Sequence, residues 1–299
     1  MAAQISASNQ RKWSLTHLRS RLSRWRKRCF GGLAVTAGGA LMVLGSAGSL
    51  PAIALTDEEF GRRLESVPVF TILREDGRPV VVFPNRSNNN SPPNPEDARI
   101  LSFLDPDNVE EFMERIRQEN SEEAGNVSIF ISSIGDVYQW GVDNPDGPKI
   151  EYYPIADQIP EALRIVREAN PDRNIQRFPG VPLFVATNSD GNGYLTLEQD
   201  GRKVVPFFFR LEDLNSVLEQ FRSSSDASIL DDVKVEVATL DQILDILRSS
   251  DASQGDLVER IRLIPSGEAL EYVRGLRESS ENAQEEAERP TEGAGALVP

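Results

Sequence analysis

Histidine and cysteine are almost missing from this chain of 299 residues, which contains one of each, His17 and Cys29. Both lie in a leader that we expect to be removed. The mature chain would then lack a Ser-His-Asp or Cys-His triad, a histidine general base, and every imidazole or thiolate metal ligand. It would also form no disulfide. These absences exclude the commonest hydrolase mechanisms and zinc sites.

The leader has the pattern of a cleaved signal peptide. Residues 1–54 contain no Asp or Glu, and their basic residues are Arg11, Lys12, Arg19, Arg21, Arg24, Arg26, Lys27 and Arg28. An uncharged run from Cys29 to Leu55 includes the small-x-small sequence Ala52-Ile53-Ala54, so we predict export and cleavage after Ala54. Two alternatives stay open. The run is long enough to be retained as a membrane anchor, and a plastid transit peptide has a similar composition.

Negative charge dominates the predicted mature chain. The whole sequence has 32 basic and 47 acidic residues, and eight of the basic ones lie in the leader, so the net charge of the mature chain falls to −23. Such a surface repels nucleic-acid backbones and anionic lipid headgroups. We therefore expect no nucleic-acid partner and at most peripheral contact with membranes. A solvated surface is the simplest interpretation of the charge, with specific cation binding as the alternative.

The two halves of the mature sequence repeat one another. Val67-Pro68-Val69-Phe70 returns as Val181-Pro182-Leu183-Phe184. An Asp-Gly pair follows each at the same distance, as Asp76-Gly77 and Asp190-Gly191, so the offset is 114 residues in both places. A duplicated unit of this length implies one pseudo-symmetric body.

Hydrophobic patterning predicts the same order of elements in each half: a hairpin, then strand and helix three times in alternation. Because alternating strands and helices place helices over a sheet, the fold class is α/β, with a mixed sheet and covering helices, duplicated into a pseudo-twofold, two-lobed body. The first repeat half spans 55–175 and the second 176–278. Residues 279–299 are acidic and lack periodicity, which predicts a disordered tail. Spacing leaves open whether the lobes share one core or only meet along the axis.

The glycine turn of the second half resembles the start of a calcium-binding loop. From Asn188 to Thr196, oxygen donors fall at positions 1, 3, 5 and 9, and Gly193 stands at the sharp turn. The twelfth position is Gln199 instead of the bidentate Glu, and the flanks read as strands. A glycine-rich hairpin also explains these residues, and it is the interpretation we favour.

Two aromatic runs allow two interpretations. Phe207-Phe208-Phe209 and Tyr152-Tyr153 lie in predicted strands, whose successive side chains face opposite sides. Both runs therefore fit a strand that is covered on both faces, which is the default. The alternative is an aromatic wall that faces a groove.

No pattern predicts an enzyme. The mature chain offers Lys149, Lys203 and Lys234 as its lysines, none in a Ser-x-x-Lys setting. No Walker loop is present, and Gly191-x-Gly193 lacks the third glycine and the following helix of a dinucleotide site. We expect neither catalytic residues, nor a cofactor, nor a metal.

Several short segments, in order along both halves, resemble one family: the twenty-two-kilodalton subunit of the Tic translocon of the chloroplast envelope, in its cyanobacterial branch. The segments are Val67–Ile72, Ser132–Gln139, Gly180–Phe184, and Gly193–Thr196 running on to Val205–Phe209. The resemblance implies a soluble exported protein of the periplasm, or of the thylakoid lumen or plastid intermembrane space. It also implies a chaperone that escorts unfolded polypeptides and precursors, including outer-membrane barrels of the Omp85 type, with apolar pockets on a pseudo-symmetric α/β body.

A chaperone that works without ATP needs exposed apolar surface for its clients and a charged rim for solubility. Our candidates for polypeptide binding are Phe70 and Phe184, which are equivalent in the repeat, followed by Phe208 and Tyr152. Two other function classes stay open. One is an adaptor or structural component of an envelope translocon, and the other is a module that binds calcium or a small ligand.

Overall fold

The computed structural model describes residues 57–84, 94–119, 127–188, 193–223, 233–248 and 255–288. The predicted signal peptide, residues 189–192 of the calcium-like turn and residues 289–299 lie outside the described residues.

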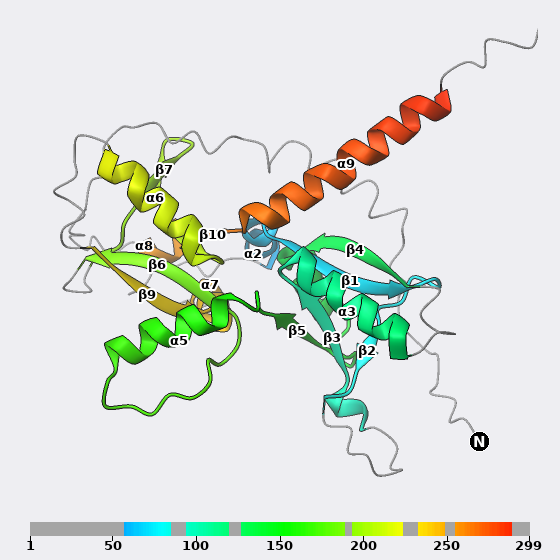
Figure 1. Cartoon of the computed structure of the whole chain (residues 1–299), viewed down its shortest axis with the longest axis horizontal. Helices are drawn as coiled ribbons and strands as arrows, with labels where there is room; N and C mark the ends of the chain where they lie inside the picture. Colours follow the sequence, from blue (N-terminus) through cyan, green and yellow to red (C-terminus); the bar gives the residue numbers. More distant parts are fainter. Residues whose placement is uncertain are drawn as a thin grey trace, which may run out of the picture.

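The first half forms one mixed sheet with helices on both sides (Figure 1). Its strand order is β4-β1-β3-β5, with the short β2 pairing with β3 beside β1; β3 and β5 are parallel and the other pairs are antiparallel. The elements are α2 (Asp57–Leu64), β1 (Pro68–Arg74), β2 (Val81–Val82), the 3-10 helix η1 (Pro95–Asp97), β3 (Arg99–Phe103), α3 (Pro106–Glu119), β4 (Val127–Ser133), α4 (Ile134–Asp143), β5 (Lys149–Tyr153) and α5 (Gln158–Ala169).

The second half repeats this sheet strand for strand, in the order β9-β6-β8-β10, with β7 pairing with β8 and with β8 and β10 parallel. Its elements are β6 (Pro182–Asn188), β7 (Leu197–Gln199), β8 (Arg202–Phe208), α6 (Leu211–Ser223), β9 (Val233–Thr239), α7 (Leu240–Arg248), α8 (Gly255–Arg260), β10 (Ile261–Ile264) and α9 (Gly267–Glu288). The sequence analysis did not predict α8.

Hydrogen bonds repeat along with the strands. The amide of Ile134 donates to the carbonyl of Val67 at 3.0 Å, and the equivalent amide of Leu240 donates to the carbonyl of Val181 at 2.8 Å. Capping boxes also recur: Ser133 and Asp136 begin α4, and Thr239 and Gln242 begin α7. The predicted mixed α/β fold with an internal duplication is therefore confirmed.

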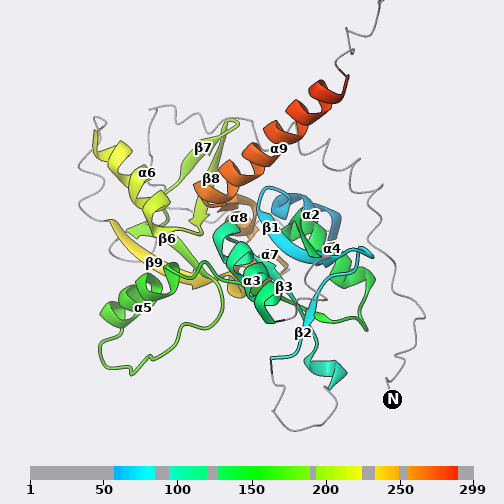
Figure 2. The same cartoon turned by 45° about the vertical axis from the view of Figure 1, so that its right-hand side comes forward.

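The last helix of each half lies on the sheet of the other half. Helix α5 contacts β6 and β9, while α9 crosses back to contact β1 and α3 (Figures 1 and 2). Small residues make these contacts close: Ala162 of α5 packs in the cluster of Phe184, and Ala269 of α9 packs in the cluster of Phe70. The ring of Tyr272 on α9 meets Phe70 edge-on, with centroids 5.4 Å apart. The two halves are thus interlocked.

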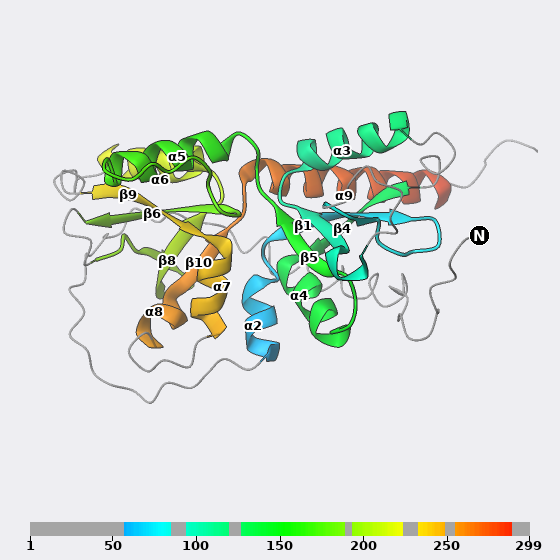
Figure 3. The same ribbon diagram turned by 90° about the horizontal axis from the view of Figure 1, so that it is seen from below.

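A shared core joins the halves on the opposite side of the sheets, where α2, α4, α7 and α8 lie (Figure 3). This core combines Leu64 and Ile134 of the first half with Leu183, Phe207 and Leu240 of the second, each 3% exposed or less. The two alternatives left by the sequence are therefore both realised, because the halves share one core and are also related by a pseudo-twofold axis.

The disordered tail predicted from Ser279 is wrong for its first ten residues, since α9 continues to Glu288. The sequence of this segment has no apolar periodicity. It is nevertheless rich in Glu and Ala, which have high intrinsic helix propensity, and it extends a helix that already begins on sheet contacts.

Helix α2 packs unusually close to α4. A Cβ added at Gly135 would lie 2.3 Å from the carbonyl oxygen of Gly61, so even a methyl group must push α2 away. We expect Gly135→Ala to lower the free energy of unfolding by about 1–3 kcal/mol in urea denaturation. Gly275→Ala on α9 is the matched control, because its Cβ would meet nothing within 4 Å. That change should raise stability by about 0.5–1 kcal/mol. Equal effects of the two changes would contradict the close contact.

Candidate functional site

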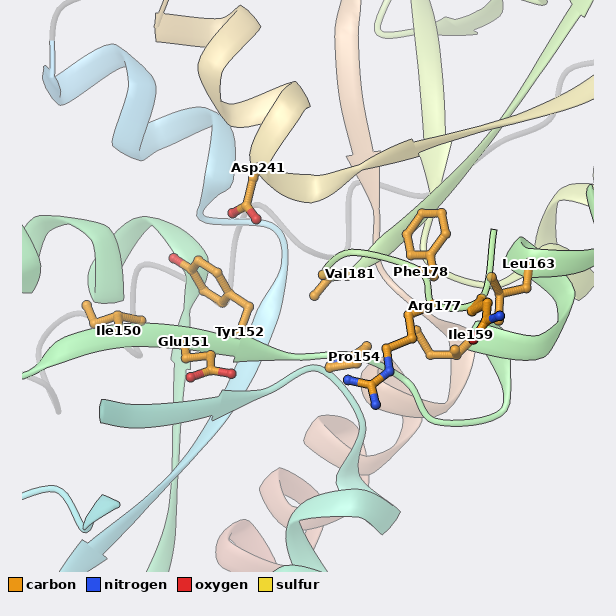
Figure 4. Close-up of a pocket in the computed structure, with 12 residues that line it drawn as sticks. Ile150, Glu151, Tyr152, Pro154, Ile159, Leu163, Arg177, Phe178, Val181 and Asp241 are labelled. Carbon is orange, nitrogen blue, oxygen red and sulfur yellow. The ribbon is translucent and has the colours of Figure 1, made fainter. Parts of the chain in front are cut away.

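A pocket of about 630 Å³ opens beside β5, between the two halves of the molecule. Figure 4 shows its walls, which come from β5, the start of α5, the chain before β6 and the start of α7. The lining residues are Ile150, Glu151, Tyr152, Pro154, Ile159, Leu163, Gln176, Arg177, Phe178, Gly180, Val181 and Asp241. Most of them are apolar and half-buried, a composition typical of ligand pockets.

Tyr152 stands in the pocket wall with its ring directed toward α7, where Asp241 begins the helix (Figure 4). Burial raises the pKa of Tyr152 above its usual value, and the negative charge of Asp241 raises it further. The phenol therefore stays protonated at any physiological pH and remains available as a hydrogen-bond donor.

Charged side chains mark two ends of the pocket. Glu151 and Asp241 lie toward the β5 and α7 side, and Arg177 lies near Pro154 and Ile159 (Figure 4). All three are exposed. Gly180 passes close to Asp241: its φ is +88°, and an added Cβ would lie 3.4 Å from a carboxylate oxygen. The pocket therefore offers an apolar floor with acidic groups at one end and a guanidinium at the other.

Strand β5 forms an edge of its sheet. Among the strands of the described residues it pairs with β3 alone. Its outer backbone groups therefore run along the pocket without a strand partner in the described part of the chain. An edge of this kind can accept an added strand.

The four residues predicted to bind polypeptide fall in two places. Tyr152 lines the pocket. Phe70, Phe184 and Phe208 lie in the cores of the two sheets, with exposed fractions of 0%, 0% and 3%. The expectation that these phenylalanines wall an open pocket is therefore wrong in this structure, because the exchanged helices cover the faces on which they lie. Whether Tyr152 binds polypeptide stays a prediction.

Residues that sequence reasoning missed make most of the pocket. Phe178 and Gly180 lie in an irregular segment, where no periodicity marks them. Asp241 occupies the repeat position of Gly135, so a carboxylate replaces a glycine at the start of equivalent helices. That difference between the halves is visible in the sequence and is a signal that could have pointed to the pocket.

Exposed apolar side chains are few elsewhere. Within the described residues, the large hydrophobic side chains that are plainly exposed are Val142 at 44% and Leu276 at 45%. They lie on different helices, α4 and α9, and form no patch by themselves. These two isolated side chains offer no continuous apolar surface, whereas the pocket groups several half-buried apolar side chains in one hollow.

The hypotheses on the phenylalanine run and on the calcium-like turn have separate outcomes. Phe207 and Phe209 are 3% and 1% exposed, so Phe207-Phe208-Phe209 forms part of the core, as its default interpretation predicted. In the calcium-like turn, the side-chain oxygen of Asn188 accepts a hydrogen bond from the amide of Gly193 at 3.0 Å. Residues 189–192 lie outside the described residues, and elsewhere in the described ranges no cluster of acidic residues could hold a metal ion.

A cluster of four charged residues lies where the chain crosses between the halves; we call Arg210, Asp105, Asp157 and Glu268 the central arginine cluster. The guanidinium of Arg210 donates to Asp157 at 2.8 Å, to Asp105 at 3.1 Å and also to Glu268. Burial alone would lower the pKa of Arg210, but the bond to Asp157 and the charges of Glu268 and Asp105 raise it overall. The cation is therefore permanent, and the cluster is structural.

Comparison with known proteins identifies the family. The model of the Tic22-like family matches residues 4–273, which is nearly the whole chain. The chain belongs to the Tic22-like family. No curated protein matches the sequence.

Two solved Tic22 structures share the fold. Tic22 from Anabaena, described as a protein of protein transport, has 20% identity and a TM-score of 0.60, and the match covers 74% of this chain and 97% of that one. Tic22 from Plasmodium falciparum has 19% identity and a TM-score of 0.54, covering 73% of this chain and 98% of that one. At these identities the likeness concerns the fold alone.

Across the described ranges of this Tic22-like chain, none of the helices combines the length and the apolar character that a bilayer crossing requires.

Proposed function

We propose that this Tic22-like protein is exported and acts in protein transport by binding segments of unfolded or precursor polypeptides in the pocket beside β5. The observation that carries the proposal is the pocket itself, an apolar hollow of about 630 Å³ bordered by an unpaired strand edge. Apolar side chains of a client segment can enter the hollow. The Anabaena relative's description as a protein of protein transport supports the same function.

The high negative charge fits this role, because it limits self-association of a protein that carries apolar binding surface. The resemblance stated above supplies two further parts of the proposal: the periplasm as compartment, and outer-membrane barrels of the Omp85 type as clients.

Release of the chain by osmotic shock, with Leu55 at its amino terminus, is the expected result for a cleaved periplasmic protein. A membrane-bound chain that retains its first 54 residues would contradict it.

Changing the pocket should weaken client protection without unfolding the protein. Ile159 and Leu163 are half-buried pocket residues one turn apart on α5, and neither belongs to the core clusters. We expect Leu163→Asp to raise about tenfold the chain concentration needed to suppress aggregation of a urea-unfolded Omp85-type barrel, measured by light scattering. The reason is that burying a leucine side chain is worth about 1.5–3 kcal/mol.

Leu276→Asp is the matched control, because it places the same charge on an exposed leucine of α9 away from the pocket. It should protect the client as well as the wild type does. If Leu163→Asp also protects fully while its circular dichroism is unchanged, the pocket is not the client site. Absence of protection by the wild type, together with tight binding of one specific envelope protein, would indicate an adaptor instead.

A further inference from the structure

The pocket has a counterpart in the first half of the molecule, and α2 fills it. Gly135 at the start of α4 touches the backbone of Gly61, and the ring of Tyr138 lies 4.5 Å from that of Phe60. On the far side of α2, Arg63 donates to the carbonyl of Val258 in α8. Burial lowers the pKa of Arg63, and the nearby charge of Arg262 on β10 lowers it further. We call Gly135, Tyr138 and Arg262 the α2 contact site.

The repeat maps this site onto the pocket. An offset of 106 residues takes Gly135 to Asp241, and an offset of 111 takes Arg262 to Glu151. Val67, which follows α2, corresponds to Val181 at the offset of 114. Asp241, Glu151 and Val181 all line the pocket. The two places are therefore equivalent under the pseudo-twofold axis.

The second half supplies no helix for its own site. The residues equivalent to α2 at the offset of 114 are 171–178, and the structure shows them as turn and irregular chain. Three of them, Gln176, Arg177 and Phe178, lie in the wall of the hollow, and no helix of the described residues fills it. Duplication of one unit thus produced two equivalent sites, one filled by the chain itself and one left open.

We propose that the open pocket binds a short amphipathic helix with a basic side, presented by the client polypeptide. This inference rests on the proposed function and specifies the conformation and charge of the bound segment. The model for the segment is α2, which buries Phe60 and Leu64 four positions apart, each 2% exposed or less, and carries Arg62 and Arg63. A helix with this spacing presents both apolar side chains on one face.

The charges of the two sites indicate which charge the occupant of the pocket carries. The α2 contact site has a glycine and an arginine where the pocket has Asp241 and Glu151. Asp241 also keeps an incoming helix farther out than α2 lies, because a side chain stands where Gly135 allows backbone contact. A lysine or arginine on the occupant can span that gap and pair with Asp241, and also with Glu151, which already lies 4.0 Å from Arg99. Arg177, at the other end of the pocket, repels any cation of the occupant that lies close to it.

The test uses a fluorescein-labelled peptide with the sequence of residues 56–67, stapled as a helix on its polar face and carrying Gln in place of Asp57, Glu58 and Glu59. We expect saturable binding to the mature wild-type chain by fluorescence anisotropy. A version with Ser in place of Phe60 and Leu64 should bind at least about tenfold more weakly, which corresponds to 1.4 kcal/mol.

The protein variants test the pocket and its charge. Asp241→Asn combined with Glu151→Gln should weaken binding of the basic peptide about tenfold and leave binding of a version with Gln in place of Arg62 and Arg63 unchanged. Asp245→Asn is the matched control, since it lies one turn further along α7, is exposed and does not line the pocket. It should leave both affinities unchanged.

Two results would overturn this inference while leaving the proposed function intact. In one, the stapled peptide does not bind although Leu163→Asp still weakens client protection. In the other, an unstapled version with a proline at its centre binds better than the helix, which indicates strand addition to β5. If neither the peptide nor the client responds to any pocket variant, the proposed function fails as well.

Discussion

Arg210→Ala is expected to lower the free energy of unfolding by about 3–5 kcal/mol. The side chain of Arg210 is 12% exposed, and that of its partner Asp105 is 4% exposed. Removal of the guanidinium leaves Asp105 with an uncompensated charge in the interior. It also leaves Asp157 and Glu268 close to that charge, where the three carboxylates repel one another.

The position of the central arginine cluster explains why so much depends on it. Asp105 and Arg210 are equivalent residues of the two halves, and two equivalent residues touch only where the pseudo-twofold axis passes. Asp157 and Glu268 are also equivalent, and each opens the segment that carries the chain across to the other sheet. One guanidinium therefore holds both crossing segments.

Equivalent hydrogen bonds beside the cluster hold the same segments. The side chain of Asn108 accepts from the amide of Ala156 at 3.2 Å, and that of Asp213 accepts from the amide of Gly267 at 3.3 Å. Burial raises the pKa of Asp213 above its usual value, although its bond to Gly267 and the charge of Arg210 oppose the rise. Arg210→Ala removes that opposing charge and so adds to the cost.

Urea denaturation at pH 7 measures the effect, with Arg164→Ala as the matched control. Arg164 also bridges two carboxylates, those of Glu161 and Glu168, but its side chain is 52% exposed on the surface of α5. Its loss should cost less than about 1 kcal/mol. A cost for Arg210→Ala no greater than that of Arg164→Ala would show that the cluster does not hold the crossing segments.

The first repeat half, expressed alone as residues 55–175, is expected to be unfolded. Its sheet loses α9, so Phe70 loses its contact with Tyr272 and the cluster around Val109 loses Ala269. Its own last helix, α5, loses the sheet on which it packs, because α5 contacts β6 and β9 of the second half. The shared core is also divided, and several buried side chains of α2 and α4 become exposed to water.

Far-ultraviolet circular dichroism and amide proton dispersion in NMR spectra measure this loss. The control is co-expression of residues 55–175 with residues 176–299, which supplies the missing helix and sheet and should restore a folded heterodimer. A dispersed, cooperatively melting spectrum from the first half by itself would show that the exchange of helices is not needed for folding.

The sequence predicted the elements well because their signals are local. The apolar spacing of Val109, Phe112, Met113 and Ile116, for example, depends only on positions within one helix. Helix α8 was missed because six residues are too few to show a period. The ten residues added to α9 were missed because helix propensity, without an apolar face, leaves no pattern.

The candidate site was predicted only in part, because periodicity shows which apolar side chains share an element but not which of them stay exposed. The patterns of Phe70 and Phe184 showed correctly that these side chains are apolar and lie in strands, but exposure depends on which helix covers the strand. Tyr152 lines the pocket because its strand lies at an edge beside the hollow, and its binding of polypeptide stays a prediction. Phe178 and Gly180 come from irregular chain whose position is set by distant contacts.

By itself, the sequence determined the α/β class, the duplication, the order of the elements and the absence of histidine and cysteine beyond the leader, since each of these is a property of composition or of local spacing. Only the tertiary structure decided that α5 and α9 exchange sheets, that one arginine holds the crossing, and that one of two equivalent sites stays open. An amphipathic helix carries an apolar face but no information on which sheet will cover it. That choice is made by packing between residues far apart in the chain.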